Sequence, residues 1–294
     1  MRIIDFHTHT FPDKIVGPAL ESLRNASNTN THSDGTVSGL RASMKRAGVD
    51  VSIILPVVTN PDKASSMNNY AARMNEDFEK TGVFSLGGIH PLSPDIKSVL
   101  KEAKDLGLKG IKLHPDYYDI DFNDIRIKRI IDIASEMGLF IITHAGRDIG
   151  LYPPIRCTLD SIIDVLKDVK PETLVLAHMG GWMNWEEVND RLGTIVKEYN
   201  EGFEASESKG VYLDSAFSIG DISWRDDNTD GCHQMSDDMF RKMVKTFGSD
   251  RILFATDSPW ADQEDYVKRI NAMGLSEADL ELIYHRNAEN ILGI

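Results

Sequence analysis

Short apolar runs of strand length recur eight times along this chain of 294 residues, and loops and segments of helical periodicity lie between them. Hydrophobic residues are nearly continuous within each run, which is typical of strands buried on both faces of a parallel sheet. The runs cover residues 3–6, 51–57, 83–89, 108–113, 139–143, 173–177, 211–214 and 252–255. The helical patterns cover residues 40–47, 94–106, 125–137, 159–169, 185–199 and 239–247.

Eight such units predict an α/β fold of the (β/α)8 (TIM) barrel type, which typically takes about 250 residues. We expect one domain over residues 1–294, ending in a helix that starts at a capping box of Ser276 and Asp279. Ser93 is expected to cap the helix that follows it, with Pro94 at the first helical position. A doubly wound open sheet is the alternative, but it usually has fewer strands, and the first strand-to-helix turn lacks a glycine-rich phosphate motif.

The charge balance narrows the range of partners. The formal net charge is −14, and the lysines and arginines are scattered through helical segments. A nucleic-acid backbone or an anionic membrane would be repelled, so we expect neither as a partner. Two cysteines, no secretory leader pattern and no apolar run near the ~18 residues of a membrane span predict a cytoplasmic protein.

Polar residues stand where the apolar runs end. The first run ends in Asp5-Phe6-His7-Thr8-His9, and because side chains alternate along a strand, His7 and His9 should lie on the same side. The other strand ends carry His90, Lys112, His114, His144, His178 and Asp257. In a barrel, all these ends open at one mouth, where active sites are built. Imidazoles with a carboxylate predict one divalent metal ion, first Zn²⁺, with Mn, Fe, Co or Ni as alternatives.

Several longer motifs carry a family resemblance. They are Gly110-Ile111-Lys112-Leu113-His114-Pro115, Thr143-His144-Ala145-Gly146, Ala177-His178-Met179-Gly180-Gly181 and Leu253-Phe254-Ala255-Thr256-Asp257-Ser258-Pro259-Trp260. With them the chain resembles the amidohydrolase superfamily. Within it, the chain is most similar to the amidohydrolase-related family, which includes 2-amino-3-carboxymuconate semialdehyde decarboxylase, resorcylate decarboxylases and several lactonases and hydratases.

The resemblance implies that His7, His9, His144 and Asp257 ligate one metal ion and that His178 is a catalytic residue beside it. Three neutral imidazoles and one carboxylate leave a net charge of +1, so water bound there would supply hydroxide near neutral pH. Asp257 could relay the proton of that water, and His178 could polarise a carbonyl or act as a general acid.

Four further residues are expected to contact the substrate. In some superfamily members a lysine at the end of the fourth strand is carbamylated and bridges two metals. Lys112 stands at that place, but nothing else in the sequence indicates a second metal, so we expect it to face the substrate or support the ligands; an ion-paired core lysine is the alternative. His114 lies two residues after Lys112 on the same predicted strand, so both side chains could face the mouth.

Arg147 could clamp a carboxylate, or it could form a surface salt bridge. His90 is similar to a residue of the superfamily's metal-dependent deoxyribonucleases, which have a glutamate where this chain has Lys112, so we expect a pocket role or a structural role instead.

The leading hypothesis is a metal-dependent hydrolase that attacks a small-molecule amide, lactone or ester with metal-bound hydroxide. The first alternative is a metal-dependent non-oxidative decarboxylase of a small unsaturated or aromatic carboxylic acid, and the second is a non-catalytic barrel that binds a metal or metabolite. A homodimer is left open.

Two long polar segments, residues 25–39 and 218–236, either close over the mouth or are solvated insertions.

Overall fold

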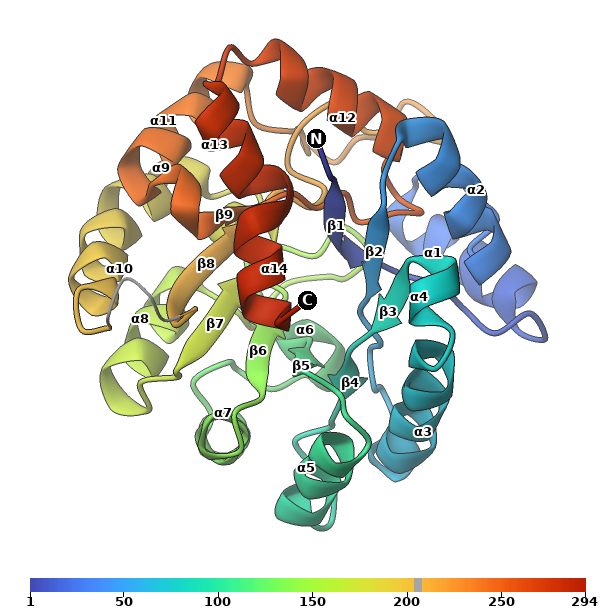
Figure 1. Cartoon of the computed structure of the whole chain (residues 1–294), viewed down its shortest axis with the longest axis vertical. Helices are drawn as coiled ribbons and strands as arrows, with labels where there is room; N and C mark the ends of the chain where they lie inside the picture. The colour runs from blue at the N-terminus through green and yellow to red at the C-terminus, as the bar shows by residue number, and fades with distance from the viewer. Residues whose placement is uncertain (204–207) are drawn as a thin grey trace.

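The computed structural model describes residues 1–203 and 208–294, and its strands form the expected parallel barrel surrounded by helices (Figure 1). The strands are β1 (Ile4–Thr8), β2 (Val51–Ile54), β3 (Val83–Ser85), β4 (Gly87–Gly88), β5 (Gly110–Leu113), β6 (Phe140–Thr143), β7 (Thr173–Leu176), β8 (Gly210–Asp214) and β9 (Ile252–Leu253). Leu86 joins β3 to β4 and donates its N–H to the carbonyl of Ile54, so these two segments act as one barrel strand. The ring closes where Phe6 N–H donates to the Phe254 carbonyl at 2.9 Å.

Strand residues are buried on both sides, which explains the continuous apolar runs. In β6, Phe140 and Ile142 join the cluster inside the barrel, whereas Ile141 joins the cluster between the barrel and the helices. In β7, Val175 faces inward and Leu174 outward in the same way. The predicted two-sided burial is therefore confirmed, and every predicted run contains a strand.

Helices form the outer ring (Figure 1). They are α1 (Val16–Ser27), α2 (Val37–Ala47), α3 (Ala64–Asn75), α4 (Phe78–Thr81), α5 (Ile96–Asp105), α6 (Pro115–Tyr118), α7 (Ile125–Glu136), α8 (Leu159–Asp168), α9 (Trp185–Glu187), α10 (Gly193–Asn200), α11 (Asp237–Phe247), α12 (Gln263–Ala272), α13 (Glu277–Glu281) and α14 (Asn287–Leu292). The sequence patterns did not indicate α1, α3 or α12. Gly17 and Pro18 in the first turn of α1 are poor helix formers, and polar residues dominate α3 and α12, so the helical pattern of all three is weak.

Two predicted helix starts had different outcomes. The capping box of Ser276 and Asp279 is confirmed, because each side chain bonds the backbone of the other residue. The predicted cap at Ser93 is wrong, because α5 starts at Ile96 and the Asp95 carboxylate accepts from the Ser98 N–H at 3.0 Å. An Asp at the N-cap satisfies a free helix N–H more directly than a residue two positions earlier could.

The last helix covers the end of the barrel opposite the mouth. Ala288 and Leu292 of α14 pack in the interior cluster with Ile4 and Phe140, and Figure 1 shows this helix across the barrel end that faces the viewer. The carboxyl ends of the strands therefore open on the far side. Within the described ranges, no helix is both long and apolar enough to cross a membrane. The expected cytoplasmic location and the homodimer stay predictions.

The two long polar segments are joined to each other. Thr29 forms an antiparallel bridge with Trp224, and Asn30 N–H donates to the Ser223 carbonyl at 2.7 Å. Arg225 N–H donates to the carbonyl of Asn28 at 3.0 Å. Residues 25–39 and 218–236 therefore form a connected border, and Thr29 places that border on the wall of the cavity described below.

Candidate metal centre and cavity

His7 and His9 reach the mouth because β1 is irregular near its end. Phe6 faces the barrel interior, so strict alternation would turn His7 outward. The pairing of β1 with β2 shifts register between Asp5 and Thr8, and such an irregularity re-aims the side chains that follow. His7 and His9 consequently lie together, as the sequence predicted.

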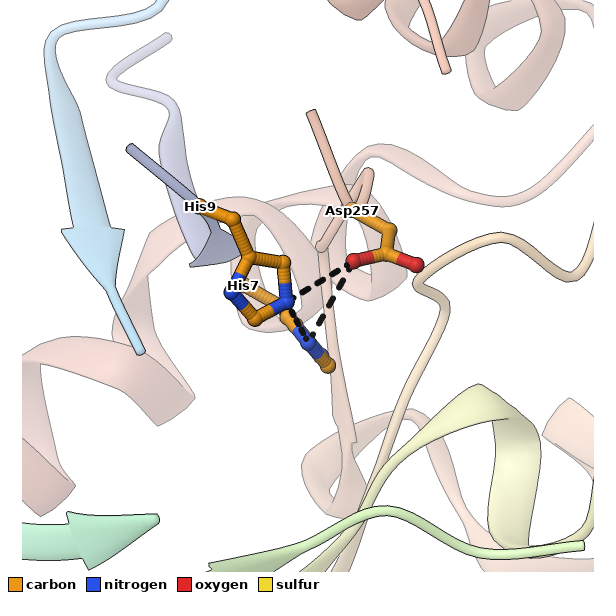
Figure 2. Close-up of side chains that lie close together, drawn as sticks. All are labelled: His7, His9 and Asp257. Carbon is orange, nitrogen blue, oxygen red and sulfur yellow. Dashed lines mark hydrogen bonds and ion pairs between the residues drawn. The ribbon is translucent and has the colours of Figure 1, made fainter. Parts of the chain in front are cut away.

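His7, His9 and Asp257 form one compact group of candidate ligands (Figure 2). Nε2 of His7 lies 3.1 Å from Nε2 of His9, and Oδ1 of Asp257 lies 3.5 Å and 3.1 Å from these two nitrogens. Ligand atoms about 2.0–2.1 Å from a tetrahedral zinc ion would be roughly 3.3–3.4 Å apart. The spacing of the three atoms therefore fits one divalent metal ion.

Hydrogen bonds on the far side of each ring turn a lone pair toward this group. Nδ1 of His7 donates to the Asp214 carboxylate at 2.9 Å, and Nδ1 of His9 donates to the Leu55 carbonyl at 2.9 Å. In the neutral imidazoles the proton is then on Nδ1, and Nε2 keeps its lone pair. Two lone pairs and a carboxylate oxygen this close repel one another unless a cation lies among them, so the donor set fits a metal.

His144, the fourth expected ligand, lies beside His178. Nδ1 of His144 is 2.9 Å from Nε2 of His178, whose Nδ1 is 2.9 Å from the Ala216 carbonyl oxygen. That carbonyl can only accept, so neutral His178 carries its proton on Nδ1 and accepts from His144 on Nε2. Nε2 of His144 is then a buried lone pair with no hydrogen-bond partner among the described residues. Although His144 falls outside the compact group of three, it keeps one nitrogen for a metal.

Asp214 is a site residue that the sequence analysis missed. It ends β8, is fully buried, and accepts from His7 Nδ1 and from the His178 backbone N–H, each at 2.9 Å. Burial raises the pKa of Asp214 to about 7, although nearby Lys112 opposes the rise. Burial also lowers the pKa of His7 well below its ordinary value, which keeps this imidazole neutral as a metal ligand requires. The rule that polar strand ends face the mouth would have included Asp214.

Lys112 lies beside the candidate ligands. Its side chain is 1% exposed, and Nζ lies 3.3 Å from Nε2 of His7. Burial lowers the pKa of Lys112 to about 8, while Asp214 and Asp257 partly sustain it. Among the described residues Lys112 has no direct ion pair, so its ammonium is placed to receive an anionic group of a substrate.

A second group of candidate ligands stands next to the first. Nε2 of His114 lies 3.2 Å from Oδ2 of Asp148, and the His114 ring stacks on His144 with centroids 4.3 Å apart. His114, His144 and Asp148 could together hold a cation. Asp148 follows β6 in a loop, where no spacing rule pointed to it. His114 thus lies in the mouth, but it belongs to this second group rather than to the compact group of three.

Arg147 and His90 differ in their positions. Arg147 lines the cavity, and its guanidinium forms an ion pair with Asp230 of the segment 218–236, which matches the surface-salt-bridge alternative. His90 lies outside the cavity lining: its Nδ1 accepts from the Leu92 N–H at 3.1 Å, and its ring packs on Tyr118. A substrate contact for His90 stays a prediction that none of its contacts supports.

The backbone is strained at His178 and Asp257. Their φ angles are 58° and 69°, a left-handed conformation that costs a non-glycine residue roughly 1–2 kcal/mol. The indole N–H of Trp185 donates to the His178 carbonyl at 3.1 Å, and Asp257 N–H donates to the His7 carbonyl at 2.8 Å. Strain that neighbouring bonds hold in place is a common property of functional residues.

One cavity of about 720 Å³ connects both groups of candidate ligands with the inner faces of α1 and α3. Its apolar walls include Phe11, Leu23, Leu55, Met67, Trp182, Phe217 and Trp260. Charged and imidazole groups are concentrated at the strand ends. The arrangement suits a ligand with a polar group at the metal centre and an apolar remainder.

Comparison with solved structures shows the same fold in several decarboxylases. The chain is 17% identical to 5-carboxyvanillate decarboxylase from Sphingomonas paucimobilis, with a TM-score of 0.67 over 100% of this chain and 99% of that one. It is 14% identical to 2,6-dihydroxybenzoate decarboxylase from Rhizobium, with a TM-score of 0.71 and the same coverage. It is 15% identical to a 5-carboxyvanillate decarboxylase from Novosphingobium aromaticivorans complexed with manganese and a nitrobenzoic acid, with a TM-score of 0.68 over 100% and 96% of the two chains.

A comparison with curated proteins found no match. A model of the amidohydrolase family matches residues 4–294. This match includes every motif that carried the resemblance, from His7 and His9 through Asp257. The chain is therefore a member of the amidohydrolase family.

Proposed function

We propose that this protein is a metal-dependent decarboxylase that removes CO2 from a small aromatic or unsaturated carboxylic acid. The observation that carries the proposal is the convergence of His7 Nε2, His9 Nε2 and Asp257 Oδ1 beside the buried ammonium of Lys112, in a cavity with apolar walls. His7, His9 and Asp257, with His144 as the fourth ligand, would hold the metal. A divalent ion bound there supplies positive charge to a substrate oxygen.

Lys112 would bind the carboxylate of the substrate. A buried ammonium without an ion-pair partner is costly, and an incoming carboxylate compensates that cost. The apolar walls disfavour the localised charge of the carboxylate, whereas they accept neutral CO2. Together these groups hold the acid by its charge and favour the loss of that charge.

Asp257 would handle the proton. In the reaction the bond between the ring or vinyl carbon and the carboxyl carbon breaks, CO2 leaves, and the electron pair left on the carbon takes a proton that Asp257 would first take up from water. Oδ1 of Asp257 faces the two histidines, while Oδ2 forms no hydrogen bond or ion pair with another described residue and stands apart from the dashed interactions in Figure 2. Burial lowers the pKa of His178, so its neutral ring serves as a hydrogen-bonding group rather than as the acid.

The three solved relatives described above support decarboxylation over the hydrolysis that the sequence analysis placed first, because each is a decarboxylase of an aromatic acid. Hydrolysis by the same ligands is the second candidate, and the family match with amidohydrolases favours keeping it. A non-catalytic barrel is the least supported reading, since Asp257 and His178 both sit in a strained conformation.

The test is CO2 release by protein reconstituted with Mn²⁺ or Zn²⁺, using 2-hydroxybenzoates and related aromatic acids. In deuterated water the product should carry deuterium at the carbon that lost its carboxylate. Asp257→Asn should abolish the reaction, and a surface change such as Asp250→Asn should not. Hydrolysis of lactones or esters by the same preparation, without CO2 release from any acid, would replace this proposal with the hydrolase.

A further inference from the structure

Two helices present apolar stripes to the cavity. On α1 and the residue before it, Ile15, Ala19 and Leu23 recur every four positions, which places them on one helix face. Along α3, Met67, Tyr70 and Met74 recur at three and four positions and form a second stripe. Both stripes line the same cavity as the metal centre. The part of the cavity between the two stripes, called the arm below, is therefore continuous with the reaction site.

The arm is larger than the proposed chemistry requires. The whole cavity measures about 720 Å³, which falls within the ~300–1,000 Å³ of pockets that hold drug-sized ligands. A single ring with its carboxylate beside Lys112 would fill only the part near the strand ends. The space between α1 and α3 is then left for a further apolar part of the ligand.

Exposure along the arm indicates that something apolar covers it. Ile15 is 52% exposed and Tyr70 is 42% exposed, and both belong to the cavity lining. Large side chains left open in a concave site are typical of a binding surface rather than of ordinary protein surface. Among the described residues of α1 and α3 that line the cavity, Arg73 alone carries a charge, and its side chain is largely exposed.

We propose that the substrate is an amphiphilic acid whose carboxylate lies at Lys112 and whose apolar tail, larger than one ring, lies between α1 and α3. The position of the carboxylate rests on the proposed function. The tail is an addition, and it rests on the two stripes. Ala19 has the smallest side chain of the α1 stripe and lies between Ile15 and Leu23, so it leaves room there for the tail.

Chain-length dependence of binding tests the tail without requiring turnover. Calorimetry would measure the affinity of straight-chain carboxylates from butanoate to decanoate for the Mn²⁺-loaded full chain. Each methylene buried between the stripes should tighten binding by about threefold to fourfold. Ala19→Phe should remove most of this dependence, because the added ring fills the arm.

Ser22→Phe is the matched control, since Ser22 lies exposed on α1 outside the cavity lining and receives the same added ring. Leu23→Asn is a second variant that puts a polar group of similar shape in place of an apolar one between the stripes, and it should also flatten the dependence. Retention of bound metal would show that each variant is folded at the centre.

Two results would overturn the tail: affinity that does not change with chain length in the unaltered protein, or a dependence that both Ala19→Phe and Leu23→Asn preserve. If aromatic acids lose CO2 while chain length has no effect on affinity, the proposed function stands and the proposal of an apolar tail between α1 and α3 is wrong. If chain length governs binding but no acid is decarboxylated, the tail stands and the proposed reaction is wrong.

Discussion

Nδ1 of His144 lies 2.9 Å from Nε2 of His178, and this contact determines which nitrogen of His144 is free. Because His178 donates its own Nδ1 proton to the Ala216 carbonyl, it can only accept from His144. The unpartnered Nε2 of His144 is thereby held as a lone pair that can bind a metal. His178 therefore has a positioning role in addition to any contact with the substrate.

Replacing His178 tests this role. His178→Asn should weaken metal binding by about 10–100-fold and lower kcat with it, because His144 loses the partner that holds its Nε2 lone pair in place. Enzyme assays and competition with a chelator on the same preparation give both values. Unchanged metal affinity in this variant would mean that His144 is held in place without its bond to His178.

Asp214→Asn should weaken metal binding. Asp214 accepts from His7 Nδ1, and removal of such a partner typically costs 10–100-fold in metal affinity. Competition with a chromogenic chelator measures the change, and Asp250→Asn on the surface is the control. An affinity equal to that of the unaltered protein would show that the His7 ring is held without this bond.

Arg147 and Asp230 should behave as a pair. Their ion pair joins the loop after β6 to the segment 218–236, and a partly exposed pair contributes little, typically below about 1 kcal/mol. Arg147→Ala and Asp230→Asn should therefore raise KM by similar factors of less than about five. A much larger KM for Arg147→Ala than for Asp230→Asn would instead identify Arg147 as a clamp for the substrate.

Asp116 should make stability depend on pH. Burial raises the pKa of Asp116 from 3.8 to about 6, and its Oδ2 is buried without a partner among the described residues. A raised carboxyl pKa means that the folded state binds the proton more tightly than the unfolded state. The ionised Asp116 carboxylate therefore destabilises the folded state. This effect is absent below about pH 4, grows as the pH rises, and is complete above about pH 6.

The side chain introduced by Asp116→Asn carries no charge at any pH. The free energy of unfolding of this variant should therefore rise, relative to that of the unaltered protein, by on the order of 3 kcal/mol between pH 4 and pH 7. Urea unfolding at several pH values measures the difference in free energy. The exposed Asp105→Asn is the control and should show no such trend. A constant difference across this range would show that Asp116 is not desolvated as the structure indicates.

The sequence predicted the barrel and much of the mouth because two simple periodicities were intact. Continuous apolar runs located the strands, and the parity of Lys112 and His114 correctly placed both in the mouth. His7 and His9 also converge as alternation predicted, although the irregular pairing between Asp5 and Thr8, which turns both toward the mouth, could not be read from the sequence.

Other parts of the site could not be predicted from local patterns. Asp148 comes from a loop, and its position depends on how β6 and the following turn pack. The helices α1 and α3 were missed because Pro18 and a run of polar residues obscure their periodicity, so the apolar arm of the cavity was missed with them. Asp214, in contrast, ends a predicted strand, so the rule that polar strand ends face the mouth could have found it.

Metal content of the purified full chain tests the central claim most directly, measured for the unaltered protein and for His144→Ala and His114→Ala. We predict about one equivalent of a divalent transition metal in the unaltered protein and its loss in His144→Ala. The metal should be retained in His114→Ala, because His114 stacks on His144 but is not one of the four proposed ligands. Metal that survives in His144→Ala and is lost in His114→Ala, or no metal even after reconstitution, would contradict the account.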